Sequence, residues 1–395
     1  MPLRARGITH INSDWPNIAC TLFRYIRQNL KRSIIVPYFT AMFTFTFFRA
    51  YSRNLTFSSY QVTQIRTAMV SQVINEIASY MLQRRLTFKS LGCIVPSFDR
   101  ADAGQGAQYV GMGKDLYSDY PSARQVFEEA DDALGSNLTK LMFEGHQKDL
   151  TQTQNAQPAI LTMSVATLRV LESEYGFDVS SACTYALGHS LGEYTALVAT
   201  QSLSLRDAVK LVRLRGEAMA NTVSQLGVKT AMSALIVREK NLDNLKTSID
   251  EICSTLPEGE LVELANINSS FQAVISGTGK AVDYASRVLQ SQHLAARALD
   301  LPVSLMQPAA NMMQKAMGDI KFKKPIVDVI SNVTANPIQS VSEIPSLLVR
   351  QVTGTVQWHK SIRYCKENGI NNFILFGPAR VLANLLKKDY PLDYV

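Results

Sequence analysis

The segment TYALGHSLGEYTALVAT, residues 184–200, constrains the fold more than any other part of the chain. A short apolar run leads to Ser190, which stands between Gly188 and Gly192, and a helix-like run follows. A serine at a sharp turn between a strand and a helix is typical of the nucleophile in α/β enzymes. At such a helix start the N–H of Leu191 is free to donate and the helix dipole favours negative charge. The segment therefore predicts Ser190 as nucleophile and Leu191 as an oxyanion donor, against the alternative of a plain turn whose serine caps a helix.

The pattern of apolar and amphipathic runs differs between regions of the sequence. Short apolar runs alternate with amphipathic segments from residue 104 onward, whereas residues 229–304 contain strand-like runs around a helical one. Such alternation over a short length predicts a small α+β subdomain inserted into a larger domain. We expect a large α/β domain from residues 104–228 and 305–395, and a poorly structured extension over residues 1–103.

The basic character of the chain is concentrated at its start. Residues 1–90 hold twelve lysines and arginines against Asp14 and Glu76, and the rest of the chain carries more acidic than basic residues. The formal net charge of +7 therefore gives no reason to expect a nucleic-acid partner. An Arg-rich, acid-poor leader is typical of a mitochondrial transit peptide, and the alternative is an upstream extension without a role. The apolar stretch 33–48 is short and interrupted by a proline, so no firm membrane span is expected.

The cysteines are scattered and form neither a CxxC pair nor a Cys/His cluster; they are Cys20, Cys93, Cys183, Cys253 and Cys365. This pattern excludes a disulfide framework and a zinc site as working hypotheses, and it suits a reducing compartment. No metal ligands are expected.

Two further motifs bear on the chemistry. The loop GQGAQYVGMG, residues 104–113, is glycine-rich, but no acidic residue on a second strand supports a dinucleotide site, and completion of an oxyanion hole fits better. Arg215 follows Ser190 by 25 residues. If the helices between them fold back as an antiparallel pair, the guanidinium returns to the serine and can bind a carboxylate bidentately. The alternative is a surface arginine.

Taken together the motifs resemble a known family. GQGAQ, QNAQPA, GHSLGEYTAL, VRLRGEAM, NINSSFQAVISG, LPVS with LMQPAA, RQVTGTVQW and FGPARVL occur in the order seen in malonyl-CoA:acyl-carrier-protein transacylases. The resemblance covers about residues 104–390 and is greatest to the mitochondrial enzyme of fungal fatty-acid synthesis. It implies an α/β fold in which an α/β-hydrolase-like large domain carries an inserted small ferredoxin-like subdomain.

The resemblance also implies a mechanism and a set of site residues. In the family the serine is acylated by malonyl-CoA, and the malonyl group then passes to the phosphopantetheine thiol of an acyl carrier protein, without a further cofactor. By motif, Ser190 is the nucleophile, Gln105 and Leu191 supply the oxyanion donors, Arg215 binds the malonyl carboxylate, and Gln157, Asn266 and Gln351 line the substrate pocket. A mitochondrial matrix location follows from the leader and the family together.

The chain departs from the family at the general base. The family carries a histidine after the small subdomain, in a pattern close to LPVS-x-P-x-H-x-x-LM-x-PA. Here Ser304 runs directly into Leu305, and about six residues that include the histidine are missing. None of His10, His146, His189, His293 and His359 is expected to replace it. Charges in SFDRADAGQGAQ are a second departure, where the family has the end of a core strand.

The two departures indicate an error in the gene model, and the alternative is a homologue that has lost its base. General acid–base catalysis contributes roughly 10²–10⁴-fold. The chain as written is therefore expected to turn over very weakly or not at all. Two rival functions stay open: a serine esterase of the α/β-hydrolase type, which has no need of Arg215, and a non-catalytic scaffold that binds acyl-CoA or carrier protein.

Overall fold

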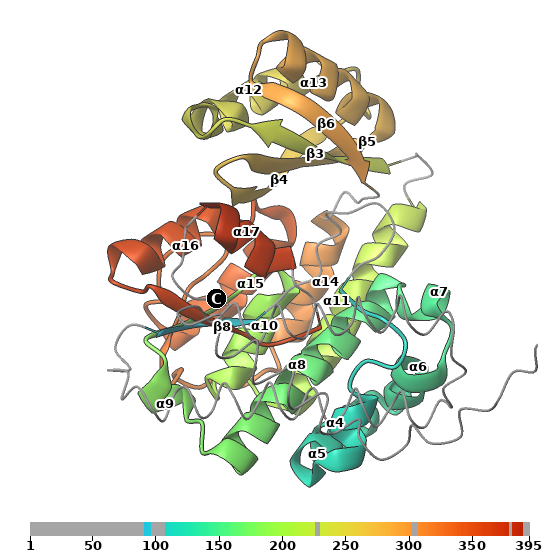
Figure 1. The fold of residues 1–395 in the computed structure, drawn as a ribbon. Coiled ribbons are helices and arrows are strands. Elements are labelled where there is room, and N and C mark those ends of the chain that lie inside the picture. Colours follow the sequence, from blue (N-terminus) through green and yellow to red (C-terminus); the bar gives the residue numbers. More distant parts are fainter. Residues whose placement is uncertain (1–90, 96–106, 226–229, 302–306, 379–380, 390–395) are drawn as a thin grey trace, which may run out of the picture. The chain divides into compact units, whose positions relative to one another are not determined.

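The computed structural model describes residues 91–95, 107–225, 230–301, 307–378 and 381–389, and two four-stranded sheets organise this part of the chain (Figure 1). The first sheet has the strand order β7-β2-β1-β8, and all of its pairs are parallel. Its strands are β1 (Leu91–Val95), β2 (Tyr185–Gly188), β7 (Asp328–Val329) and β8 (Asn372–Leu375). Parallel strands need crossover connections, so segments far apart in sequence meet here.

Strand β1 corrects the predicted boundary of the leader. Residues 1–103 were expected to be a poorly structured extension, yet Leu91–Val95 lies between β2 and β8, with Gly92 opposite Tyr185 on one side and Phe373 on the other. The run LGCIV is apolar and contains β-branched residues, which suits a strand with neighbours on both sides. The prediction is wrong for these five residues. The rest of the predicted extension, 1–90 and 96–103, lies outside the described residues.

Three helices of this part of the chain pack together. Helix α10 (Leu191–Ala199) follows β2 directly, and α8 (Thr153–Tyr175) and α11 (Leu205–Gln225) pack against each other and against α10. Helix α8 is capped at its C-terminus by Gly176, whose φ of 64° is the left-handed conformation that glycine adopts readily. The other helices of this part are α4 (Lys114–Asp119), α5 (Pro121–Leu134), α6 (Leu138–Glu144), α7 (Gln147–Leu150), α9 (Val179–Ala182), α14 (Gln307–Met317), η3 (Val341–Glu343), α15 (Ile344–Thr353), α16 (Trp358–Glu367) and α17 (Val381–Asp389).

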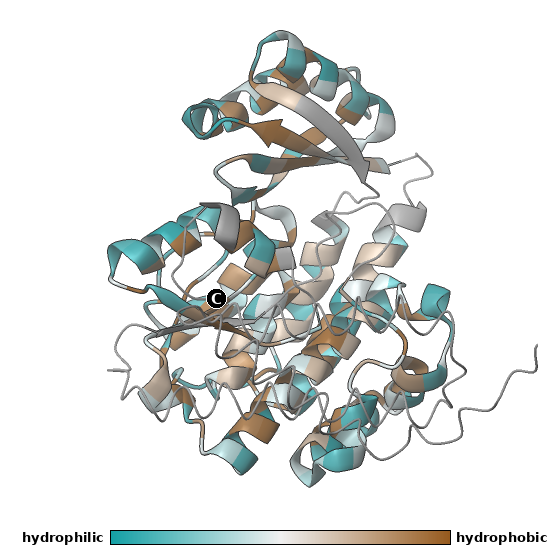
Figure 2. Ribbon diagram, viewed as in Figure 1, coloured by the Kyte–Doolittle hydropathy of each residue, from teal (hydrophilic) through white to brown (hydrophobic). Residues whose placement is uncertain are grey.

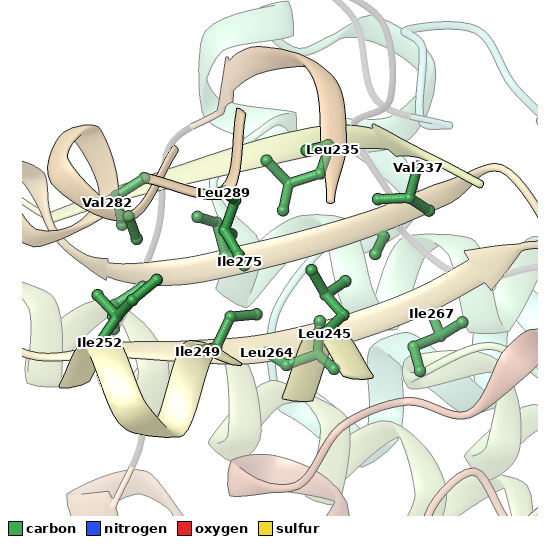
Figure 3. Packing of buried hydrophobic residues seen from close by; sticks show 14 of the residues in the cluster. Leu235, Val237, Leu245, Ile249, Ile252, Leu264, Ile267, Ile275, Val282 and Leu289 are labelled. Atoms are coloured by element: carbon green, nitrogen blue, oxygen red, sulfur yellow. The ribbon is translucent and has the colours of Figure 1, made fainter. Parts of the chain in front are cut away.

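The second sheet is antiparallel and has the order β4-β5-β3-β6. Its elements follow one another as β3 (Thr230–Val237), η2 (Glu239–Asn241), α12 (Leu242–Ser254), β4 (Val262–Ser269), β5 (Gln272–Thr278), α13 (Gly279–Ser291) and β6 (Ala295–Leu301). Leu245, Ile249 and Ile252 of α12 lie over Ile275 and Leu264 of the strands in one apolar cluster (Figure 3). Hydrophilic residues occupy the outer sides of α12 and α13 (Figure 2). This amphipathic pattern is what fixes both helices on the sheet.

Strand β4 also bonds to the segment that precedes α16. The N–H of Ile267 donates to Val356 O at 2.9 Å, and the N–H of Val356 donates to Ala265 O at the same distance. The sheet of β3–β6 is thereby attached to the segment RQVTGTVQW, residues 350–358. None of the described helices is long and apolar enough to cross a membrane, and the described residues contain no cluster of three potential metal ligands.

Candidate active site

Ser190 occupies a strained turn between β2 and α10, residues 188–192, which we call the elbow. Its φ of 50° and ψ of −111° lie outside the regions that residues with side chains favour, and such strain concentrates at functional positions. A Cβ built on Gly188 would lie 2.1 Å from the carbonyl oxygen of Gly192, so the strand end and the helix start touch through backbone alone. Gly188 is therefore required by close approach. Ser190 is half-buried, while its neighbours His189 and Leu191 are buried.

We expect Gly188→Ala to destabilise the protein strongly. The added methyl group meets rigid backbone at a separation that real Cβ atoms do not adopt, so the elbow must open, at a cost on the order of 3 kcal/mol. Urea unfolding followed by circular dichroism measures the loss. Gly176→Ala is the matched control, because φ is positive there but no atom lies within 4 Å, and its cost is about 1 kcal/mol. Equal losses for the two variants would contradict the close-approach argument.

Asn332 hydrogen-bonds to the backbone of the elbow from a distant segment of the chain. This side chain is buried in the segment after β7, where its Oδ1 accepts from the N–H of Ser190 at 2.6 Å and its Nδ2 donates to Gly188 O at 2.7 Å. The two bonds hold the backbone on either side of His189. Sequence reasoning missed this residue. The available signal was a polar Ser-Asn pair at the end of the core-type run PIVDVISNV.

The guanidinium of Arg215 reaches Ser190. Its Nη2 donates to Ser190 Oγ at 2.9 Å and to Gln351 Oε1 at 3.2 Å, and its Nη1 donates to Gln157 Oε1 at 2.8 Å. Arg215 is only 4 % exposed, and its Nε has no acceptor among the described residues. Burial lowers the pKa of the guanidinium from its usual high value. A buried cation whose hydrogen-bond partners are all uncharged is a site that an anion would stabilise.

The close packing of α11 against α8 places Arg215 beside Ser190. Gly216 follows it on α11, and a Cβ there would lie 2.5 Å from Gln154 Cα near the start of α8. The absent side chain lets α11 approach α8 closely, which brings Arg215 within hydrogen-bonding distance of Gln157 one turn further along α8. The glycine in RLRGEAM thus has a packing reason.

Glu193 is a further buried polar residue of the elbow. It lies in the first turn of α10 and is fully buried, and its Oε2 accepts from Gln351 Nε2 at 2.6 Å. The same Gln351 Nε2 donates to Ser190 O at 2.9 Å. Burial raises the pKa of Glu193 to about 7, and hydrogen bonds from Gln351 and Asn332 oppose this rise. Sequence reasoning gave Glu193 no role, although a carboxylate inside the apolar run LGEYTALVA was a visible signal.

The remaining predicted residues are Leu191, Asn266 and Gln105. Leu191 is the first residue of α10, so its N–H has no partner within the helix. Asn266 is buried in β4, opposite Val274, and no hydrogen bond in the described part joins its side chain to Ser190 or Arg215. Gln105 lies outside the described residues.

The described histidines do not engage the serine. His189 Nε2 lies 2.9 Å from Asn268 Oδ1, and its ring centroid lies 5.6 Å from that of Trp358, so the ring is held on the β4 side of the elbow. His359 is buried, and its Nε2 lies 3.7 Å from Glu239 Oε1. Of the residues that the structure describes, only Arg215 hydrogen-bonds to Ser190 Oγ. The site therefore brings a serine hydroxyl and a buried guanidinium together, and no other side chain in its described part hydrogen-bonds to that hydroxyl.

Comparison with known proteins agrees with this arrangement. The family model described as "Acyl transferase domain" matches residues 103–390. The malonyl CoA-acyl carrier protein transacylase of Bacillus subtilis (strain 168) is 41% identical over 291 residues, which cover 72% of this chain and 88% of the relative. The acyl-carrier-protein S-malonyltransferase of Bartonella henselae, a solved structure, has a TM-score of 0.67 at 41% identity and covers 76% of this chain and 93% of its own.

A third comparison includes a protein partner. A malonyl-transacylase solved in complex with a type II PKS acyl-carrier protein has a TM-score of 0.66 at 33% identity, over 77% of this chain and 94% of its own. In all three cases the match spans most of the other protein, and the residues that the family model matches, 103–390, include Ser190 and Arg215. The chain belongs to the malonyl CoA-acyl carrier protein transacylases, a group within the acyl transferase domain family.

Proposed function

We propose that the chain transfers the malonyl group of malonyl-CoA to acyl carrier protein through an ester on Ser190, as a step that feeds fatty acid synthesis. The observation that carries the proposal is the buried guanidinium of Arg215, 2.9 Å from Ser190 Oγ and surrounded by uncharged partners. A malonyl group differs from an acetyl group by a carboxylate. The arginine is therefore placed where it can distinguish the two acyl groups.

The proposed reaction has two half-reactions at one serine. Arg215 holds the free carboxylate while Ser190 Oγ attacks the thioester carbonyl; the new C–O bond forms, negative charge develops on the carbonyl oxygen, and the C–S bond then breaks to release coenzyme A. The N–H groups of Leu191 and Gln105 would stabilise that oxyanion. The thiol of the carrier's phosphopantetheine attacks the ester in the second half-reaction and restores the serine. No cofactor is needed beyond the substrate and the partner's own prosthetic group.

The proton of Ser190 needs an acceptor in this scheme. Strand β6 ends at Leu301 and α14 begins at Gln307, so five residues, 302–306, connect them. We propose that the family's histidine-bearing loop belongs in this connection and that its loss reflects the gene model. The chain as written then forms the ester slowly, since the hydroxyl must lose its proton to water.

Three finer assignments belong to the same proposal. The parallel order β7-β2-β1-β8 with an elbow after β2 supports an α/β-hydrolase-like large domain, and the strand–helix order from β3 to β6 supports a ferredoxin-like subdomain. We place that subdomain at residues 229–304. The basic composition of residues 1–90 supports a leader for import into the mitochondrial matrix, in keeping with the fungal mitochondrial type.

The proposal predicts how the protein binds its donor. We expect the full chain to bind malonyl-CoA more tightly than acetyl-CoA and to acquire a malonyl adduct that intact-protein mass spectrometry detects after long incubation. Ser190→Ala should keep the binding and lose the adduct. Equal affinity for the two thioesters would contradict the carboxylate site. Binding without any adduct in the unsubstituted chain would favour the scaffold, and hydrolysis of simple acyl esters without regard to a carboxylate would favour the esterase.

A further inference from the structure

One oxygen atom of Glu193 accepts hydrogen bonds from both residues that hold the elbow, Gln351 and Asn332. Glu193 Oε2 accepts from Gln351 Nε2 at 2.6 Å and from the N–H of Asn332 at 3.2 Å. Asn332 in turn bonds to the backbone on both sides of His189, and Gln351 bonds to Ser190 O. Glu193 thus connects α10 with α15 and with the segment after β7.

The same contacts determine which way the Gln351 amide points. Both Glu193 Oε2 and Ser190 O are acceptors, so they require the amide nitrogen. Arg215 Nη2 is a donor, so it requires the amide oxygen. A flipped amide would place donor against donor and acceptor against acceptor at all three contacts. Glu193 therefore keeps an oxygen of Gln351 turned toward Arg215.

The electrostatic surroundings of Glu193 are simple. Gln351 of α15, Asn332 and Ser331 after β7, and Tyr194 of α10 are uncharged, and Arg215 of α11 is the cation whose field reaches the carboxyl group. Glu193 Oε1 has no donor in the described part, and burial disfavours the ionised form. The hydrogen bonds from Gln351 and Asn332 favour it, and the positive charge of Arg215 adds a smaller effect in the same direction. The protonation state of Glu193 is therefore balanced near neutral pH between burial on one side and these contacts on the other.

We propose that Glu193 is a positioning residue for the carboxylate site and that it takes up a proton when a carboxylate binds at Arg215. The proposal rests on the proposed function, because that function supplies the carboxylate. A bound carboxylate neutralises Arg215 and adds a negative charge beside it, so the ionised form of Glu193 becomes less stable. One proton moves from solvent to an oxygen of Glu193, and no other bond forms or breaks.

The proposal has a defined dependence on pH. Proton uptake on binding means that binding strengthens as the pH falls through the range in which free Glu193 ionises. Free carboxylic acids ionise well below pH 6, so the ligand itself stays charged across that range. Acetyl-CoA has the same nucleotide and phosphates but no carboxylate. The ratio of the two affinities therefore isolates the effect at Arg215.

Ser190→Ala, which cannot be acylated, is the protein for the experiment. Its dissociation constants for malonyl-CoA and acetyl-CoA are measured by isothermal titration calorimetry from pH 6 to pH 8.5. We expect the preference for malonyl-CoA to fall roughly tenfold across this range, because uptake of one proton changes the affinity by about a factor of ten for each pH unit over which the uptake is complete. Adding Glu193→Gln keeps an oxygen acceptor for Gln351 and Asn332 but removes the titration, and we expect a flat preference. A sloping preference in that double variant would overturn the proposal.

A second measurement needs no change at Glu193. Calorimetry at pH 7 in two buffers of different ionisation enthalpy counts the protons exchanged on binding. The protein should take up more protons when it binds malonyl-CoA than when it binds acetyl-CoA. Equal counts for the two ligands, or a flat preference in Ser190→Ala, would overturn the role of Glu193 while leaving the proposed function in place. Failure of Ser190→Ala to prefer malonyl-CoA at any pH would instead overturn the proposed function, so the two failures are distinguishable.

Discussion

Arg215→Met is expected to weaken the binding of malonyl-CoA roughly a hundredfold and to leave the binding of acetyl-CoA nearly unchanged. Loss of one partner of a buried, charge-assisted pair costs about 3 kcal/mol, and about 1.4 kcal/mol corresponds to a factor of ten. Methionine has a similar length and fills the space between α8 and α11. Dissociation constants of both thioesters, measured in the Ser190→Ala background, give the result without reference to catalysis.

Arg213→Met is the matched control for this prediction. Arg213 lies two residues earlier on α11 and is half-buried, but its Nη1 donates to Asn155 Oδ1 at 2.5 Å rather than to Ser190. We expect this variant to keep the preference for malonyl-CoA. Arg215→Lys, which retains a charge without the planar fork, should be intermediate. A parallel loss of affinity for both thioesters in Arg215→Met would show a damaged fold, and an unchanged preference would remove Arg215 from recognition.

The parts of the site that sequence reasoning could reach are those whose cause is local. The turn at Ser190 requires a glycine two positions before it, and GHSLG contains that residue, Gly188. Arg215 was within reach because its spacing from Ser190 matches the return of an antiparallel helix, and the structure bonds the two side chains. The roles of Gln157 and Gln351 came only from resemblance. No local pattern distinguishes them from other glutamines.

The parts that sequence reasoning missed depend on contacts between distant segments. Asn332 bonds to Ser190 across 142 positions, and Glu193 bonds to Gln351 across 158. Neither partner can be identified without the sheet that brings the segments together. Strand β1 was missed for a related reason: its five apolar residues follow a basic leader, and its place as an inner strand is set by β2 and β8 rather than by its own sequence.

Inserting between Ser304 and Leu305 the histidine-bearing loop that we propose for this connection is expected to give the largest change in rate. An insertion of about six residues with the pattern x-P-x-H-x-x returns a histidine to the connection between β6 and α14. If the histidine accepts the proton of Ser190, formation of the malonyl ester should accelerate roughly 10²–10⁴-fold. Rapid-quench mass spectrometry of the acyl-enzyme, followed by transfer to acyl carrier protein, measures both half-reactions.

An insertion of the same length with glutamine in place of histidine separates the base from the geometry. A longer connection alone can relax the entry of the chain into α14, and that effect appears in both insertions. Only the histidine can take the proton, so the rate difference between them is the contribution of general base catalysis, and it should disappear as the pH falls below the pKa of the imidazole. Equal rates for the two insertions would mean that the proton leaves Ser190 by another route, and the loop would then have no part in the chemistry. A large difference would show that the elbow and the arginine of this chain are competent and lack only their base.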